Sequence, residues 1–277
     1  MKKKELKVKP NDATLPVSRK ELFKDVLKDD FSLNVDCGLL CGLFSLPLFA
    51  VWAIAYFLIV AAAEANYQTV FSVCFYCGLV CVPCFGIRYL AKGAVYQLYK
   101  KRAFNEGCFV SSAFWQAIRQ NFGKYFAAGA VVGVSFWLTA IGGVYFLVVA
   151  SNSVAKGLGV GICLLQLIVV YCSTSFLLCQ NCVYSLSFGN LLKNGLSFTF
   201  MRFVPCVLFF AVSVALPLWL CTLAVWAALI VLAVYITFAE SLFALSATLF
   251  AHGVFDKYIN QQNYPDLVGK GLYKQKE

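Results

Sequence analysis

Charged residues are scarce in this 277-residue chain: they make up 13% of it, while 61% of the residues are apolar. Soluble globular domains carry about 25% charged and about 45–50% apolar residues. The chain has a single histidine, and it contains no Ser/His/Asp arrangement, H-E-x-x-H motif or phosphate-binding loop. The composition therefore excludes a soluble globular enzyme, and the missing motifs predict a protein without catalytic activity.

Long apolar runs take the place of the missing charges. A membrane-spanning helix needs about 20 mostly apolar residues, because the hydrocarbon core of a bilayer is about 30 Å thick. The run 204–251 is too long for one span, and we divide it near Cys221–Ala224. We therefore predict an all-α polytopic bundle of six transmembrane helices. The predicted spans are 39–62, 70–90, 126–150, 158–178, 204–222 and 225–251.

The net charge of +10 could suggest a nucleic-acid partner, but the positions of the cations favour another explanation. With a cytoplasmic amino terminus, 21 of the 23 lysines and arginines fall in inner segments, Arg88 lies at the inner end of the second span, and Lys156 alone falls outside. Cytoplasmic loops of membrane proteins carry such an excess. We predict a cell-membrane protein with both termini in the cytoplasm and no nucleic-acid partner. Its parts are a cytoplasmic tail, 1–38, the membrane domain, 39–251, and a second cytoplasmic tail, 252–277.

Two segments outside the predicted spans have apolar residues at helical spacing. Ser18 and Glu21 have the spacing of a capping box. The residues Leu22, Phe23, Val26, Leu27 and Phe31 then form one apolar stripe. The second stripe comprises Val110, Phe114, Ala117, Ile118 and Phe122, with Ser111 and Ser112 as candidate caps. Both patterns predict short amphipathic helices on the cytoplasmic face.

Basic clusters flank the spans. Lys2, Lys3 and Lys4 can bind anionic lipid headgroups, or they can form a solvated tail that only enforces orientation. Lys100, Lys101 and Arg102 follow the second predicted span and are candidates for docking a transporter subunit.

Glu240 is the one charged residue in the run 204–251. A carboxylate at the centre of a bilayer is costly and normally faces the bundle interior, a wet cavity or a partner. Because no Lys or Arg lies at the middle of another predicted span, we expect the protonated form. Two roles stay open. Glu240 couples protons or recognises a polar solute, or it hydrogen-bonds to Gln166, Thr174 or Ser241 between helices.

The chain has 13 cysteines, four of which form the pattern C-x-x-C-x-x-x-C-x-x-C at Cys74, Cys77, Cys81 and Cys84. In a soluble protein this pattern would suggest a metal site. On a continuous membrane helix the four side chains rise along one stripe and cannot converge on one ion. We therefore predict small packing residues, and neither a metal nor a cofactor.

Glycines and a faint repeat bear on helix packing. Gly129 and Gly133, like Gly157 and Gly161, have the spacing that permits close contact between membrane helices. Shifting residues 114–126 by 78 positions superposes their apolar pattern on residues 192–204, so each copy would lead into a span from the inside.

The segments Val82–Lys92 (V-P-C-F-G-I-R-Y-L-A-K), Phe109–Lys124 and Val254–Tyr258 carry a family resemblance. They resemble the YesL-like family of bacterial multi-pass membrane proteins, over about residues 37–258. The lysine-rich tail and the many cysteines depart from that family. The family has no established biochemical activity, and its members are often encoded beside carbohydrate uptake systems. The resemblance therefore implies an accessory role in solute uptake and no catalytic residue.

Two functions remain as hypotheses. In the first, the protein is an accessory or regulatory component of a solute-uptake system, with carbohydrate as the candidate solute, and binds transporter subunits through its basic face. In the second, it is a small solute permease in which Glu240 titrates during transport.

Overall fold

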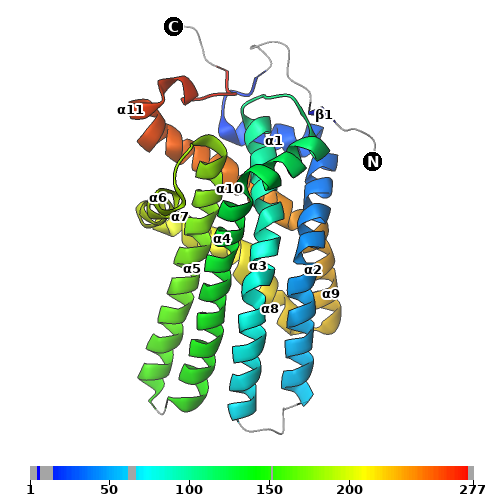
Figure 1. Ribbon diagram of the computed structural model, residues 1–277, viewed down its shortest axis with the longest axis vertical. Helices are drawn as coiled ribbons and strands as arrows, with labels where there is room; N and C mark the ends of the chain where they lie inside the picture. The colour runs from blue at the N-terminus through cyan, green and yellow to red at the C-terminus, as the bar shows by residue number, and fades with distance from the viewer. Residues whose placement is uncertain (1–4, 7–14, 62–66, 151, 274–277) are drawn as a thin grey trace.

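The computed structural model describes residues 5–6, 15–61, 67–150 and 152–273. This part of the chain is almost entirely helical, and the predicted all-α fold is confirmed (Figure 1). It contains six helices long and apolar enough to cross a membrane. They are Phe31–Val60, Gln68–Ala103, Val110–Val148, Ser153–Val183, Phe203–Leu223 and Trp226–Asn263. Lys2, Lys3 and Lys4 lie outside the described residues.

The chain forms its elements in a simple order. The first half contains β1 (Glu5–Leu6), α1 (Arg19–Asp29), α2 (Phe31–Ala61), α3 (Tyr67–Ala103), β2 (Cys108–Phe109), α4 (Val110–Val144) and η2 (Tyr145–Val149). The second half contains α5 (Ser153–Val183), α6 (Phe188–Met201), α7 (Phe203–Phe210), η3 (Ala211–Ala215), α8 (Leu216–Leu223), α9 (Val225–Val234), η4 (Tyr235–Ala239), α10 (Glu240–Phe255), η5 (Asp256–Asn260), α11 (Gln261–Asn263) and η6 (Pro265–Leu267). The two-residue strands β1 and β2 pair antiparallel.

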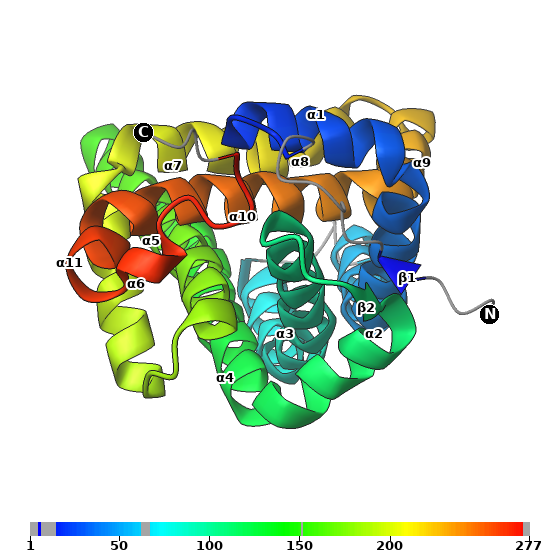
Figure 2. The same cartoon turned by 90° about the horizontal axis from the view of Figure 1, so that it is seen from above.

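Four helices, α2 to α5, stand nearly parallel, and the segment from α7 to α10 slants across them (Figure 1). Viewed from above, α10 crosses beside α3 and α5, and α1 lies against α10 (Figure 2). The elements α1, α6 and α11 gather at one end of the bundle. We call this end the α1 end. The described lysines and arginines of α1, α6 and η5 lie at this end.

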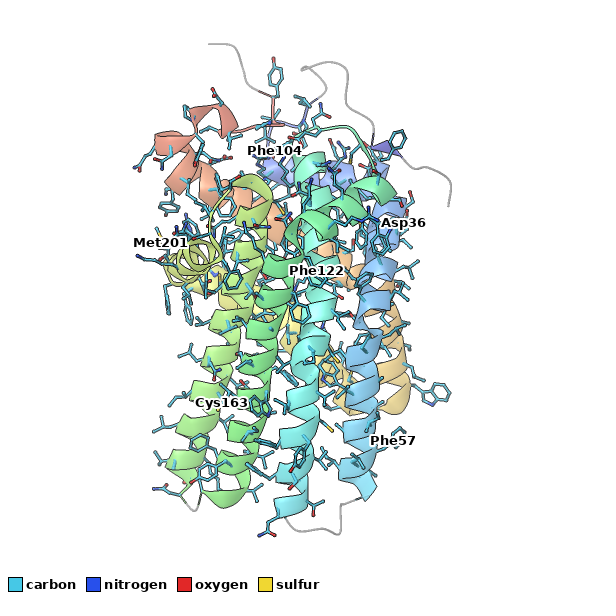
Figure 3. All side chains as sticks on the ribbon, viewed as in Figure 1. Asp36, Phe57, Phe104, Phe122, Cys163 and Met201 are labelled. Carbon is cyan, nitrogen blue, oxygen red and sulfur yellow. The ribbon has the colours of Figure 1, made fainter. Side chains whose placement is uncertain are left out.

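The outside of the bundle is apolar. Phe57 is 69% exposed and Phe122 is 53% exposed (Figure 3). Soluble monomers rarely expose large continuous apolar surfaces. Within a bilayer, the same surface contacts lipid tails, which are as apolar as leucine. The six helices and this surface together define an integral membrane protein.

Helix boundaries differ from the predicted spans in informative ways. The predicted division of the last apolar run is confirmed, because Ala224 is extended (φ −165°, ψ 155°) between α8 and α9. In contrast, α2 begins at Phe31 and α3 continues to Ala103, so the predicted boundaries at 38/39 and 90 do not fall at helix ends. Hydropathy marks the apolar part of a helix, whereas its polar continuation is stabilised by neighbouring elements.

Both predicted amphipathic helices form. In α1, Ser18 Oγ accepts a hydrogen bond from the Glu21 amide at 3.2 Å, and Leu22 and Val26 are buried. Phe31 belongs to α2 and is exposed, so its place in the predicted stripe is wrong.

The second amphipathic segment is the first part of α4. Val110, Phe114, Ala117 and Ile118 are buried there as predicted, but Phe122 is exposed beyond a kink. The helix is preceded by Phe109, which makes no side-chain cap, so the predicted capping by Ser111 or Ser112 is wrong. Ser111 and Ser112 already lie within the first turn of the helix.

Three kinks join the amphipathic helices to the spans that follow them. Asp30 lies between α1 and α2 (φ −118°, ψ 31°), Asn121 lies inside α4 (φ −124°, ψ 20°), and Arg202 lies between α6 and α7 (φ −123°, ψ 39°). The structure therefore contains three copies of the helix–kink–span arrangement. The last two kinks lie 81 residues apart, so the predicted offset of 78 is wrong by about one helical turn.

After each kink, two consecutive spans form a helical hairpin. The kink residue is hydrogen-bonded to a residue near the end of the second span of that hairpin. Arg102 Nε donates to Asp30 Oδ2 at 2.5 Å. Asn181 Nδ2 donates to Asn121 Oδ1 at 3.0 Å. The third bond runs from Arg202 Nη2 to the Tyr258 hydroxyl at 3.3 Å. The described chain is thus built from three similar units, each an amphipathic helix followed by a hairpin of spans.

The predicted close packing of glycines is half correct. A Cβ atom on Gly129 would lie 2.3 Å from the Phe85 carbonyl oxygen, and one on Gly133 would lie 2.8 Å from Val82 Cα. These glycines let α4 approach α3 closely, as predicted. Gly157 and Gly161 have no atom within 4 Å of such a Cβ. The prediction for this second pair is wrong, because spacing shows which residues share a face but not which face is covered.

Candidate functional site

Glu240 forms an ion pair with Arg88. Arg88 Nη2 lies 2.7 Å and Arg88 Nε 3.1 Å from Glu240 Oε1. The two side chains are only 12% and 4% exposed. The expectation that no cation lies near Glu240 is therefore wrong. The protonated form was expected only on that ground, so its reason is lost. Arg88 lies well inside the long helix α3, and the slanting α10 brings Glu240 against it.

Ser241 belongs to a second polar group beside this ion pair. The Tyr99 hydroxyl donates to Asn34 Oδ1 at 2.7 Å and is hydrogen-bonded to Ser241 Oγ. All three side chains are completely buried. Because they come from α2, α3 and α10, this network fixes three helices to one another. Asn34 and Tyr99 were missed by sequence reasoning, since polar residues near helix ends carry no distinctive pattern.

Gln166 and Thr174 occupy different parts of the bundle. Gln166 Nε2 donates to Ser135 Oγ on α4 at 3.4 Å. Thr174 Oγ1 donates to the Tyr171 carbonyl at 2.9 Å and lies 3.5 Å from the Tyr89 hydroxyl. Among the described residues, Glu240 is hydrogen-bonded to Arg88. The predicted hydrogen bonds from Glu240 to Gln166, Thr174 and Ser241 are therefore wrong.

Lys92 is a further buried cation in this region. It is 5% exposed, and its Nζ lies 5.0 Å from the ring centroid of Tyr89 and 4.7 Å from that of Tyr171. Such positions over aromatic faces attract an ammonium group electrostatically. The signal was readable in the sequence, because Lys92 follows Arg88 by four residues and shares its helix face.

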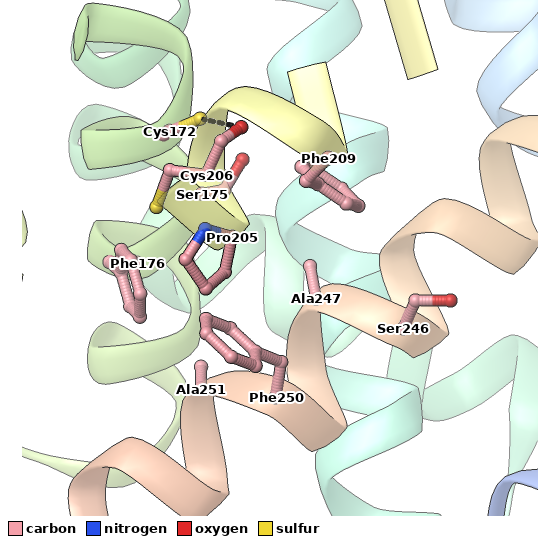
Figure 4. Close-up of a pocket in the computed structure, with 10 residues that line it drawn as sticks. All are labelled: Cys172, Ser175, Phe176, Pro205, Cys206, Phe209, Ser246, Ala247, Phe250 and Ala251. Atoms are coloured by element: carbon pink, nitrogen blue, oxygen red, sulfur yellow. Dashed lines mark hydrogen bonds between the residues drawn. The ribbon is translucent and has the colours of Figure 1, made fainter. Parts of the chain in front are cut away.

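A pocket opens between α5, α7 and α10 close to Tyr171. It has a volume of about 210 Å³ and a mostly apolar lining (Figure 4). Its lining includes Cys172, Phe176, Pro205, Phe209, Ala247 and Phe250.

The predicted docking cluster after the second span is largely neutralised inside the chain. Lys100 Nζ lies 2.9 Å from Glu106 Oε2, and Arg102 Nε lies 2.5 Å from Asp30 Oδ2. Arg102 is 7% exposed. Lys100 and Arg102 therefore do not offer a free basic surface, because Glu106 in the α3–α4 connection and Asp30 between α1 and α2 pair with them. Lys101 is half-buried.

A row of exposed lysines lies on α1, beside the exposed Glu21 and Asp29, and the sequence-based prediction missed it. Lys20, Lys24 and Lys28 recur every fourth residue and are all exposed. We call these three residues the α1 lysine row. Residues four apart lie on one face of a helix. The opposite face, with Leu22 and Val26, is buried against the bundle.

The four cysteines of the C-x-x-C-x-x-x-C-x-x-C pattern lie along one helix, and the histidine is buried. Cys81 and Cys84 are buried, and Cys74 and Cys77 are half-buried, all along α3. His252 is 3% exposed, with its ring centroid 5.0 Å from that of Phe104. Within residues 5–6, 15–61, 67–150 and 152–273, no group of three or more His, Cys, Asp or Glu side chains is placed to hold a metal ion.

No protein-family model matches the chain, and comparisons with curated proteins and with solved structures gave no significant match.

Proposed function

We propose that this integral membrane protein is a non-enzymatic accessory or regulatory component of a solute-uptake system, which docks on a transporter subunit through the α1 lysine row. The observation that carries the proposal is the exposure of Lys20, Lys24 and Lys28 on a helix whose other face is buried. The resemblance to YesL-like proteins supports the association with uptake, and a carbohydrate is the preferred solute class.

The attachment of α1 to the bundle makes this surface suitable for docking. Arg19 Nη2 lies 3.2 Å from Asp256 Oδ2, and Arg19 Nη1 donates to the Lys270 carbonyl at 3.2 Å. Helix α1 is thereby held against α10 and the carboxyl-terminal segment. A fixed row of three cations favours an acidic partner surface, and the attraction falls as salt is added.

Two sets of buried polar groups, around Glu240 and around Tyr99, support a role without catalysis. Arg88 and Glu240 neutralise each other, and Tyr99, Asn34 and Ser241 bond among themselves. Groups engaged in this way stabilise the arrangement of α2, α3 and α10.

Co-purification tests the docking proposal. We expect the detergent-solubilised protein to retain a transporter subunit, and the variant Lys20→Glu/Lys24→Glu/Lys28→Glu to lose it. Lys193→Glu/Lys257→Glu is the control, because both lysines are exposed and lie near the same end. Retention of the subunit by the triple variant would overturn the proposal.

A small permease is the second candidate, and the buried Arg88–Glu240 pair is the observation in its favour, since charges inside membrane bundles often mark solute or proton paths. Vesicles containing only this protein separate the two functions. Uptake of a labelled sugar by such vesicles, abolished by Glu240→Gln, would replace the accessory role with transport.

A further inference from the structure

Lys92 carries the unbalanced charge of the buried polar cluster. Arg88 and Lys92 bring two positive charges to one face of α3, and Glu240 brings one negative charge that bonds to Arg88. Within the described chain, the Lys92 ammonium contacts the Tyr89 and Tyr171 rings and has no hydrogen bond or ion pair. The cluster formed by these three charged residues therefore has a net charge of +1.

A buried ammonium group with three donors needs acceptors. Aromatic faces supply part of the stabilisation, but they accept no strong hydrogen bond. Desolvated charges inside a membrane bundle are normally paired, and an unpaired one marks a site of function. Lys92 is 5% exposed, which leaves it little access to water.

The Tyr171 and Phe209 rings stand between Lys92 and the apolar pocket. Tyr171, whose ring contacts the Lys92 ammonium, also stacks on Phe209 with ring centroids 6.3 Å apart. Phe209 lines the pocket, and so does Cys172, the next residue after Tyr171. The aromatic pair Tyr171 and Phe209 thus forms the boundary between an unpaired cation and an apolar space.

We propose that this combined site binds a fatty acid, with its carboxylate at Lys92 and part of its chain in the pocket between α5, α7 and α10. Tyr171 would turn aside to let the headgroup reach the ammonium. Binding at this site does not depend on docking through the α1 lysine row.

Charge and shape favour this ligand class. One uncompensated ammonium matches a monoanion, whereas a phosphate dianion needs further donors such as a free arginine fork. Arg88 is engaged by Glu240 and does not supply one. The pocket, at about 210 Å³, is larger than the roughly 150 Å³ that admits benzene in an engineered cavity. The rings of Phe176, Phe209 and Phe250 line it with apolar surface (Figure 4).

Thermal unfolding in zwitterionic phosphatidylcholine nanodiscs tests the proposal, with dodecanoate as the probe at alkaline pH and dodecan-1-ol as the uncharged control. A ligand that binds only the folded state raises Tm with its concentration, by about 5 °C at 100 times its Kd. We expect this rise with dodecanoate and none with dodecan-1-ol. Equal shifts by both compounds, or no shift with dodecanoate, would overturn the proposal.

Two variants locate the site. Lys92→Met removes the charge and retains the apolar stem, and Ala247→Phe fills the pocket. Both should abolish the dodecanoate shift, while Lys257→Met, at an exposed lysine, should leave it unchanged. An undiminished shift in Lys92→Met would refute the assignment of the headgroup site.

Native mass spectrometry covers the case in which Lys92→Met does not fold. The wild-type protein should retain one dodecanoate and Ala247→Phe none, and equal occupancy in both would overturn the proposal. Thermal unfolding in nanodiscs that contain phosphatidylglycerol distinguishes a phospholipid from a fatty acid. If phosphatidylglycerol raises Tm and added dodecanoate then has no further effect, the site binds a phospholipid headgroup, and the fatty-acid assignment is contradicted.

Discussion

Arg88 and Glu240 are separated by 152 positions in the chain, yet Arg88 Nη2 and Glu240 Oε1 lie 2.7 Å apart in the interior of the bundle. The pair connects α3, in the row of near-parallel helices, with α10, which slants across that row. It therefore fixes the last hairpin of spans to the first.

Glu240→Met should destabilise the protein by about 3–5 kcal/mol, because it leaves Arg88 buried without a counter-charge. Arg88→Met/Glu240→Met should be less destabilising than the single variant, since neither charge remains. Thermal unfolding in detergent measures both effects. A double variant as unstable as Glu240→Met would show that the pairing of the charges is not what matters.

Tyr99→Phe should destabilise the protein by about 1–3 kcal/mol, because it removes the hydroxyl that bonds to the buried Asn34 and Ser241. Tyr76→Phe is the matched control, since Tyr76 is 68% exposed, and its Tm should stay unchanged. Equal stabilities of the two variants would contradict the importance of this network.

Gly129→Ala should destabilise the contact between α3 and α4 by about 1–3 kcal/mol, because its Cβ would lie 2.3 Å from the Phe85 carbonyl oxygen. Gly161→Ala meets no atom within 4 Å and should be neutral or slightly stabilising. The difference in Tm between the two variants checks the prediction. A neutral Gly129→Ala would mean that the helices separate at little cost.

Asp30→Ala should destabilise the first unit by about 1.5–3 kcal/mol, since Asp30 accepts a charge-assisted hydrogen bond from the nearly buried Arg102. If the three units are equivalent, Asn121→Ala and Arg202→Met should also lower Tm, each by removing the bond at its own kink. Proteolysis in detergent should then show earlier cleavage near the altered kink. Unchanged Tm in all three variants would show that these bonds do not stabilise the units, and that the units share only their backbone shape.

Reporter fusions check the orientation. A fluorescent protein that folds only in the cytoplasm should be fluorescent when fused after Glu277, and alkaline phosphatase should be active when inserted at residues 62–66. The opposite pattern would invert the protein in the membrane and place the α1 lysine row outside the cell.

Much of the fold could be predicted from the sequence because its signals are local. Apolar runs reveal spans whatever their neighbours are, and Ser18 with Glu21 marks a helix start through contacts within four residues. The extent of α3 beyond residue 90 could not be predicted in this way, because its polar end is stabilised by α4 and by the bond from Arg102 to Asp30.

The candidate site was predicted only in part. Glu240 was identified because a lone carboxylate in an apolar run is costly, but its partners were assigned wrongly. Gln166 and Thr174 are polar residues within a predicted span. Hydropathy places a residue along its span but does not show which helices contact one another. Lys92 and the α1 lysine row carried readable spacing, whereas Asn34 and Tyr99 did not.

The amino-acid sequence by itself determined that the chain is a six-span membrane protein with its cations concentrated on one side, because burial in lipid and charge placement depend on composition along the chain. Only the tertiary structure decided that Glu240 meets Arg88, that Lys92 is left without a counter-charge, and that an apolar pocket lies beyond the Tyr171 and Phe209 rings. These relationships depend on the slant of α10 across α3, and the angle between two helices arises from side-chain packing between segments far apart in the sequence.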